Sequence, residues 1–134
     1  MIKKRILVTG GAGFVGSHLV DALLERGHEV RVYDNLTPQV HGDGLPGYLS
    51  PDVEFVRGDM QDRERLREMV RNIEVVFHLA AAVGVGQSMY EIAHYMGANT
   101  QGTANLLQAL LDTRCRVEKL IVASSMSIYG EGKY

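Results

Sequence analysis

Four glycines, Gly10, Gly11, Gly13 and Gly16, lie directly after a short apolar run near the start of the chain. Gly10, Gly13 and Gly16 fit the spacing GxxGxxG, and Gly11, Gly13 and Gly16 fit GxGxxG. Between a strand and a helix, such glycines serve three purposes. We expect Gly10 or Gly11 to form the turn, Gly13 to approach a pyrophosphate, and Gly16 to let the helix pack on the sheet. Free amides at the helix start would face the phosphates, so the motif indicates dinucleotide binding.

A carboxylate follows the second predicted strand, at Asp34. Asp34 at this place can accept hydrogen bonds from both hydroxyls of an adenosine ribose, whereas a 2′-phosphate would be repelled by its charge. The sequence therefore predicts NAD rather than NADP as the cofactor. A strand-end aspartate can also simply cap the next turn, and this alternative stays open.

Other polar residues stand at the ends of later predicted strands. Asp59 could reach the adenine amine with Met60 lying on the ring, or Asp59 could only close the turn after Gly58. His78 ends a buried strand, where a hydrogen-bonded core histidine is favoured over a catalytic one. The remaining histidines have no carboxylate or cysteine at metal-ligand spacing, so no metal site is predicted.

The apolar periodicity predicts strands that alternate with helices. The expected strands are Arg5–Thr9, Glu29–Tyr33, Val53–Arg57, Glu74–Leu79 and Val117–Ala123. The first expected helix is Phe14–Arg26, and the second is capped by Asp62 and runs to about Arg71. A long helical region is expected from Met89 to about Thr113, with an irregularity near Gly97. Residues 35–52 hold all three prolines and are predicted to form a long surface loop. This alternation predicts an α/β fold of the Rossmann type, a doubly wound parallel sheet of strand order 3-2-1-4-5 with helices on both faces.

Composition narrows the class of protein. The 134 residues suit one domain, and the net charge of −2 without a basic block argues against nucleic-acid and membrane partners. We expect a cytoplasmic protein with small-molecule partners, since no apolar signal core follows the first charges. Cys115 is the only cysteine, which excludes an internal disulfide and a cysteine-based metal cluster.

Taken together, these motifs resemble those of a known family. The chain is similar to the amino-terminal half of an extended short-chain dehydrogenase/reductase, in the NAD-dependent epimerase/dehydratase family that works on nucleotide sugars. The matching motifs are Thr9 to Gly16, Asp34-Asn35, Gly58-Asp59, His78-Leu79-Ala80-Ala81, Asn99 to Thr103, and Ser124 to Gly130.

The resemblance implies a role for each matched residue. It implies that NAD is held at the pyrophosphate by Gly10, Gly13, Phe14, Val15 and Gly16, at the adenosine ribose by Asp34 and Asn35, at adenine by Asp59 and Met60, and near the nicotinamide ribose by Leu79, Ala80 and Ala81. Asn99 is implied to help order the cofactor site, and Ser125 to be the catalytic hydroxyl that hydrogen-bonds the sugar oxygen being oxidised. The implied activity is transient hydride transfer from a sugar carbon to NAD⁺.

The chain departs from the family at its carboxyl end. The family's catalytic tyrosine and lysine, spaced YxxxK, come after the last residue, and Tyr129 with Lys133 fits that spacing only literally, because Gly130 and Gly132 oppose a helix there. We therefore expect a truncated domain over residues 1–134, without the substrate domain and inactive alone. Dimerisation is a further expectation, because an uncovered sheet edge favours self-association.

The sequence is compatible with several functions. Ser125-Met126-Ser127 stands where dehydratases often carry Thr-Asp-Glu, which favours epimerase-type chemistry over dehydration. A non-catalytic NAD(H) sensor or structural module of the same fold is an alternative. An NADP-dependent reductase is disfavoured by Asp34, and a scaffold without nucleotide would make the glycines and strand-end aspartates accidental.

Overall fold

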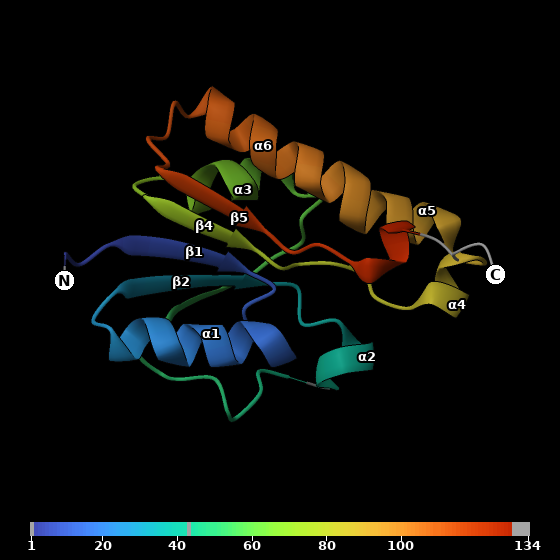
Figure 1. Cartoon of the computed structure of the whole chain (residues 1–134), viewed down its shortest axis with the longest axis horizontal. Helices are drawn as coiled ribbons and strands as arrows, with labels where there is room; N and C mark the ends of the chain where they lie inside the picture. Colours follow the sequence, from blue (N-terminus) through green and yellow to red (C-terminus); the bar gives the residue numbers. More distant parts are fainter. Residues whose placement is uncertain (1, 43, 130–134) are drawn as a thin grey trace.

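The computed structural model describes residues 2–42 and 44–129 and shows a five-stranded sheet with helices on both faces (Figure 1). The strands are β1 (Arg5–Thr9), β2 (Glu29–Asp34), β3 (Glu54–Arg57), β4 (Val75–His78) and β5 (Lys119–Val122). All pairs are parallel and their order is β3-β2-β1-β4-β5, which confirms the predicted topology. The strand order reverses between β1 and β4, the place where such sheets bind ligands beyond the carboxyl ends of the strands.

Helix α1 (Phe14–Glu25) covers one face, and α3 (Arg63–Met69) with α6 (Gly102–Asp112) covers the other (Figure 1). Successive β1 side chains divide between the two layers. Leu7 packs in the core that includes Leu66 and Leu106, whereas Val8 packs in the core that includes Val20 of α1. A central strand covered on both faces must be apolar at every position, which explains the continuous apolar run before the glycines.

The loop predicted over residues 35–52 is wrong in one part, because it contains the short helix α2 (Pro38–His41). Thr37 is the N-cap and Pro38 follows at the first helical position, where a missing N–H costs nothing. Leu49 is buried in the core beneath α1, so the segment is anchored to the domain.

The long helical region expected from Met89 to Thr113 is divided into several pieces. The structure has α4 (Val85–Ser88), α5 (Ile92–Tyr95), a π-helical segment (Met96–Gln101) and then α6. The expected irregularity near Gly97 is the π-helical segment, and a side chain at Gly97 would approach the Gln61 amide to 2.9 Å. Wide turns of this kind often mark functional sites. Across residues 2–42 and 44–129, no helix has both the length and the apolar character that crossing a membrane requires.

Candidate functional site

A cleft of about 510 Å³ lies at the carboxyl end of the sheet, between the segments that follow β1, β2, β3 and β4. It gathers twelve of the fourteen residues predicted to form the site: Gly10, Gly13, Phe14, Val15, Gly16, Asp34, Asn35, Asp59, Met60, Leu79, Ala80 and Ala81. Residues from four separate parts of the sequence therefore line one space, as the strand-end argument predicts.

The glycines form the base of the cleft. Gly10 has a φ of +70°, so the tight turn falls on Gly10 rather than Gly11, and a side chain there would come within 2.7 Å of the Ala80 amide nitrogen. A Cβ on Gly16 would overlap the Gly10 carbonyl oxygen, so Gly16 lets α1 close on the turn itself, where we expected contact with the sheet. Gly13 is less crowded, with a hypothetical Cβ 3.3 Å from the Gly10 oxygen.

Helix α1 begins at the cleft with its first amides free of side-chain caps. Its N-cap is Gly13, and its first turn contains no acidic residue. Amides of a first helical turn have no acceptor within the helix, and the helix dipole adds partial positive charge at this end. This end of α1 is therefore suited to an anion such as a pyrophosphate.

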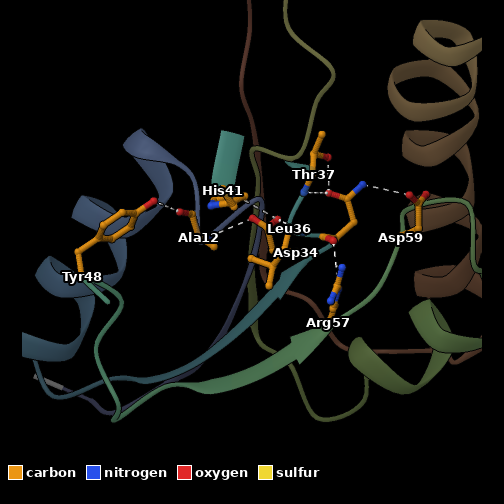
Figure 2. Close-up of polar contacts among 9 residues, drawn as sticks. Ala12, Asp34, Leu36, Thr37, His41, Tyr48, Arg57 and Asp59 are labelled. Atoms are coloured by element: carbon orange, nitrogen blue, oxygen red, sulfur yellow. Dashed lines mark hydrogen bonds and ion pairs between the residues drawn. The ribbon is translucent and has the colours of Figure 1, made fainter. Parts of the chain in front are cut away.

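Asp34 lies at the end of β2 and is 9% exposed, with its carboxylate pointing at the glycine turn (Figure 2). Oδ2 accepts from the Ala12 amide at 3.1 Å, and Oδ1 accepts from the Leu36 amide at 2.9 Å. Asp34 thus caps the turn that follows it, which was the alternative interpretation, and it also lines the cleft. The two roles are compatible, because a carboxylate has about four acceptor positions.

Neighbouring residues hold the same corner in place (Figure 2). The Tyr48 hydroxyl donates to the Ala12 carbonyl oxygen at 2.8 Å, so Ala12 is held on both sides, and His41 Nε2 lies 3.8 Å from Asp34 Oδ1. Asn35 donates to Asp59 Oδ2 at 3.1 Å, which joins the segments after β2 and β3. Asp59 also accepts from the Gln61 amide, so Asp59 closes this turn as well as lining the cleft, and its contact with adenine stays a prediction.

Met60 both lines the cleft and packs in the core. It is 7% exposed and lies against α6, where a side chain on Gly102 would meet its Cβ at 2.7 Å. Its position on an adenine ring stays a prediction. The adjacent wall includes Tyr33, whose hydroxyl donates to the Asp59 carbonyl oxygen at 2.8 Å, and burial raises the pKa of Tyr33 to about 12.

Asn99 and Ser125 lie outside the cleft lining. Both polar atoms of the Asn99 amide bind the Ala82 backbone, Oδ1 at 2.7 Å from the amide nitrogen and Nδ2 at 3.0 Å from the carbonyl oxygen. Asn99 thus holds the wall of the cleft at Ala82, in keeping with the expectation that it helps to order the cofactor site, and its direct contact with a cofactor stays a prediction. Ser125 is exposed after β5, and its hydroxyl accepts from the Ser127 amide at 3.1 Å. The literal match of Tyr129 with Lys133 extends into residues 130–134, outside the described residues.

Sequence reasoning did not assign a second set of lining residues, which come from the end of β2, from α2, α4, α5 and the π-helical segment, and from the loops between the elements. They are Tyr33, Thr37, Gln39, Val40, His41, Gly58, Gln61, Ala82, Val83, Gln87, His94, Tyr95 and Ala98. The Thr-Pro pair at residues 37 and 38 was the available signal for α2, because proline is favoured at the first helical position. Within the two described stretches, no group of three or more His, Cys, Asp or Glu side chains is arranged to hold a metal ion.

Comparisons with known proteins agree with this geometry. A model of the NAD dependent epimerase/dehydratase family matches residues 6–134. The chain is 38% identical over 134 residues to the UDP-N-acetyl-alpha-D-glucosaminuronate decarboxylase of Bacillus cytotoxicus, covering 98% of this chain and 39% of that protein. It is 37% identical to the dTDP-L-rhamnose 4-epimerase of Burkholderia thailandensis, covering 98% of this chain and 37% of that protein. The chain thus spans about two fifths of the length of these relatives.

Solved structures of similar proteins share the fold. The UDP-glucose 4-epimerase of Thermotoga maritima, solved with UDP-glucose, has a TM-score of 0.85 and 37% identity, with 97% of this chain and 41% of that chain covered. The UDP-glucose 4-epimerase of Brucella ovis, solved in complex with NAD, has a TM-score of 0.83 and 35% identity, with 98% of this chain and 38% of that chain covered.

Proposed function

Because the chain belongs to the NAD-dependent epimerase/dehydratase family, we propose that it is the NAD-binding part of an enzyme that acts on a nucleotide sugar. The observation that carries this proposal is the shared cleft, in which the uncapped start of α1 lies beside the Asp34 carboxylate. An anion site and a hydroxyl acceptor side by side in one cleft match the pyrophosphate and ribose of a dinucleotide.

The described residues fit NAD at several points. Glycine at positions 10 and 16 lets the turn pack against the Ala80 backbone and against α1, because a side chain at either position would collide there. This compact turn leaves the start of α1 at the cleft. Phe14 and Val15 are 80% and 65% exposed at the start of α1, where they would cover the phosphates. Leu79, Ala80 and Ala81 would line the path toward the nicotinamide ribose. Bound NAD⁺ would supply a hydride acceptor for a sugar carbon and would later return the hydride.

Selectivity for NAD over NADP is proposed to come from Asp34. Its two amide bonds use one position on each oxygen, which leaves further acceptor capacity for the ribose hydroxyls. A 2′-phosphate at this place would bring its charge against a carboxylate that is only 9% exposed, where solvent screens the repulsion poorly.

The substrate and the outcome of the reaction are proposed from the relatives. The similar proteins include three 4-epimerases of nucleotide sugars and a nucleotide-sugar decarboxylase. Ser125-Met126-Ser127 lacks an acid pair that could assist loss of water, which favours epimerase-type chemistry. Ser125 is proposed to hydrogen-bond the sugar oxygen in the whole protein, and the 134-residue chain is proposed to be inactive alone.

The first test is a calorimetric titration of the chain with NAD⁺ and, in parallel, with NADP⁺. Saturable binding of NAD⁺ that is at least tenfold tighter than that of NADP⁺ is the expected result, on the order of the discrimination that one unfavourable charge contact supplies. Absence of NAD⁺ binding would overturn the proposal, and equal binding of both would overturn the role of Asp34.

The second test examines the absence of turnover. The chain is incubated with NAD⁺ and UDP-glucose, and the sugar is followed by proton NMR. We expect no UDP-galactose, and appearance of UDP-galactose at an enzymatic rate would contradict the proposed inactivity of the chain alone.

A further inference from the structure

His78 is the last residue of β4, an interior strand of the sheet, and it is 4% exposed. Its Nδ1 lies 2.7 Å from the Thr9 hydroxyl oxygen on β1, and its Nε2 lies 2.8 Å from the Thr103 hydroxyl oxygen on α6. The imidazole therefore bridges the central strand of the sheet and the helix that covers it. A hydroxyl can either donate or accept a hydrogen bond, so the direction of each of these two bonds must be derived from the other contacts of the two threonines.

The contact on the α6 side fixes one proton. The Thr103 hydroxyl donates to the Asn99 carbonyl oxygen at 2.6 Å, because a carbonyl can only accept. A hydroxyl has one hydrogen, so Thr103 can then only accept from His78. Nε2 of His78 therefore carries a hydrogen.

The contact on the β1 side determines the direction of the remaining hydrogen bonds. Burial lowers the pKa of His78, so the ring is neutral near pH 7 and Nδ1 is a bare acceptor. The Thr9 hydroxyl donates to Nδ1, and the Thr9 oxygen accepts from the Ala80 amide at 3.3 Å. With Nδ1 protonated, the hydroxyl hydrogen of the fully buried Thr9 would have no acceptor among its described contacts.

Both ends of this chain of hydrogen bonds reach the same wall of the cleft. At one end, Thr9 holds the Ala80 amide. At the other end, Thr103 holds the backbone of Asn99, whose side chain binds the amide and the carbonyl of Ala82. Ala80 and Ala82 both line the cleft, so a single network determines two points of one wall.

We propose that His78 is a positioning residue: fixed as the Nε2–H tautomer, it links β1 to α6 and thereby places residues 80–82 against the cofactor. The proposal rests on the proposed function for its cofactor, but the arrangement of protons is a property of the chain itself. His78 is not among the lining residues of the cleft, so it would act on binding through Thr9 on one side and Thr103 on the other.

The tautomer is tested directly on the chain labelled with nitrogen-15 in histidine. Long-range proton–nitrogen correlation spectra near pH 7 distinguish the Nε2–H tautomer, the Nδ1–H tautomer and the imidazolium. We expect the Nε2–H tautomer for His78, assigned by its loss in His78→Asn. Either of the other two forms would overturn the proposal.

The positioning role is tested with three threonine variants. Thr103→Val removes the hydroxyl but keeps the shape, Thr103→Ser restores the hydroxyl, and Thr113→Val is the matched control. Thr113 makes the same type of bond, to the Ala109 carbonyl at 2.7 Å, at the far end of α6. A merely structural role would make Thr103→Val and Thr113→Val equal in NAD⁺ affinity.

We expect Thr103→Val to weaken NAD⁺ binding by about tenfold, roughly the effect of one buried hydrogen bond. Thr103→Ser and Thr113→Val should stay within about twofold of the parent chain, since both keep the network. The backbone amide signals of Ala80 and Ala82 should shift in Thr103→Val and not in Thr113→Val. The proposal would be overturned if Thr103→Val and Thr113→Val bound NAD⁺ equally and the Ala80 and Ala82 amide signals did not shift in Thr103→Val.

The two proposals fail in distinguishable ways. If the parent chain binds no NAD⁺, the proposed function fails, while the tautomer and the Ala82 signals still decide the role of His78 in placing the wall. If Thr103→Val does not fold, the tautomer of the parent chain and the affinity of Thr103→Ser decide the proposal. An Nδ1–H tautomer with intact NAD⁺ binding would overturn the His78 proposal alone.

Discussion

Replacing Asp34 by Asn should reduce both the stability of the fold and its affinity for NAD⁺. Two backbone amides, of Ala12 and Leu36, donate to different oxygens of the Asp34 carboxylate at 3.1 and 2.9 Å. An asparagine has one carbonyl oxygen and can satisfy only one of these amides. Its NH₂ group would then face the other amide, donor against donor.

The expected loss of stability follows from that count of donors. A buried donor without a partner costs about 1–3 kcal/mol, and Asp34 is 9% exposed, so little water can replace the lost acceptor. Loss of the charged acceptor should also weaken NAD⁺ binding by roughly tenfold to a hundredfold, the effect of a hydrogen bond to a charged group of about 1.5–3 kcal/mol. Discrimination against NADP⁺ should decrease, because the negative charge is gone.

Urea unfolding followed by circular dichroism measures the first effect, and calorimetric titration measures the second. The matched control is Asp21→Asn, which removes the same charge from an exposed position of α1 and should change the unfolding free energy by less than about 0.5 kcal/mol. If Asp34→Asn unfolds at the same urea concentration as Asp21→Asn, the two amide bonds do not stabilise the turn and our reasoning about this corner is refuted.

Three further outcomes are expected. Gly16→Ala should destabilise the fold by about 1–3 kcal/mol in urea unfolding, because the new Cβ overlaps the Gly10 carbonyl. Gly47→Ala is the control and should be near neutral, because Gly47 has open space around it and no positive φ. Equal urea midpoints for the two variants would contradict the packing of Gly16 against Gly10. Leu106→Ala should cost about 2–5 kcal/mol, since Leu106 is fully buried in the core beneath α6; a loss below about 1 kcal/mol in the same assay would show that this core collapses around the cavity. The pKa of His78 is lowered by burial, so the folded chain binds fewer protons than the unfolded chain below the ordinary value of 6.5, and stability should fall as pH decreases through that window; urea midpoints measured from about pH 7 to about pH 5 should fall less steeply in His78→Asn, and an equal slope would exclude His78 as the source.

Much of the fold could be predicted because its signals are local. The run Arg5–Thr9 is β1 as predicted, and the Asp62 side chain caps α3 by accepting from the Arg65 amide at 3.0 Å. The bounds of the region after Met89 could not be predicted. Its division into α5, a π-helical segment and α6 accompanies the close approach of the backbone at Gly97 to Gln61, a tertiary contact that the helical periodicity does not contain.

The sequence predicted about half of the residues that line the candidate site, and it did not predict their contacts. Asp34, Asn35 and Asp59 were each expected to face a ligand, yet their side chains also bind one another or the backbone. Strand ends indicate which residues meet at one edge of a sheet. They do not indicate which polar atoms remain available there, because that depends on turns whose backbone direction is set by packing.

The sequence alone determined that this chain forms a parallel sheet with a glycine turn and strand-end carboxylates, since spacing and periodicity act over a few residues of chain. Only the tertiary structure decided how His78 is protonated and what it does. Its partners Thr9 and Thr103 lie 69 and 25 positions away in sequence, and they meet the imidazole only when β1 pairs with β4 in the sheet and α6 packs over that sheet. Proton positions in a buried network depend on every donor and acceptor present, so they follow from the assembled fold rather than from any one segment.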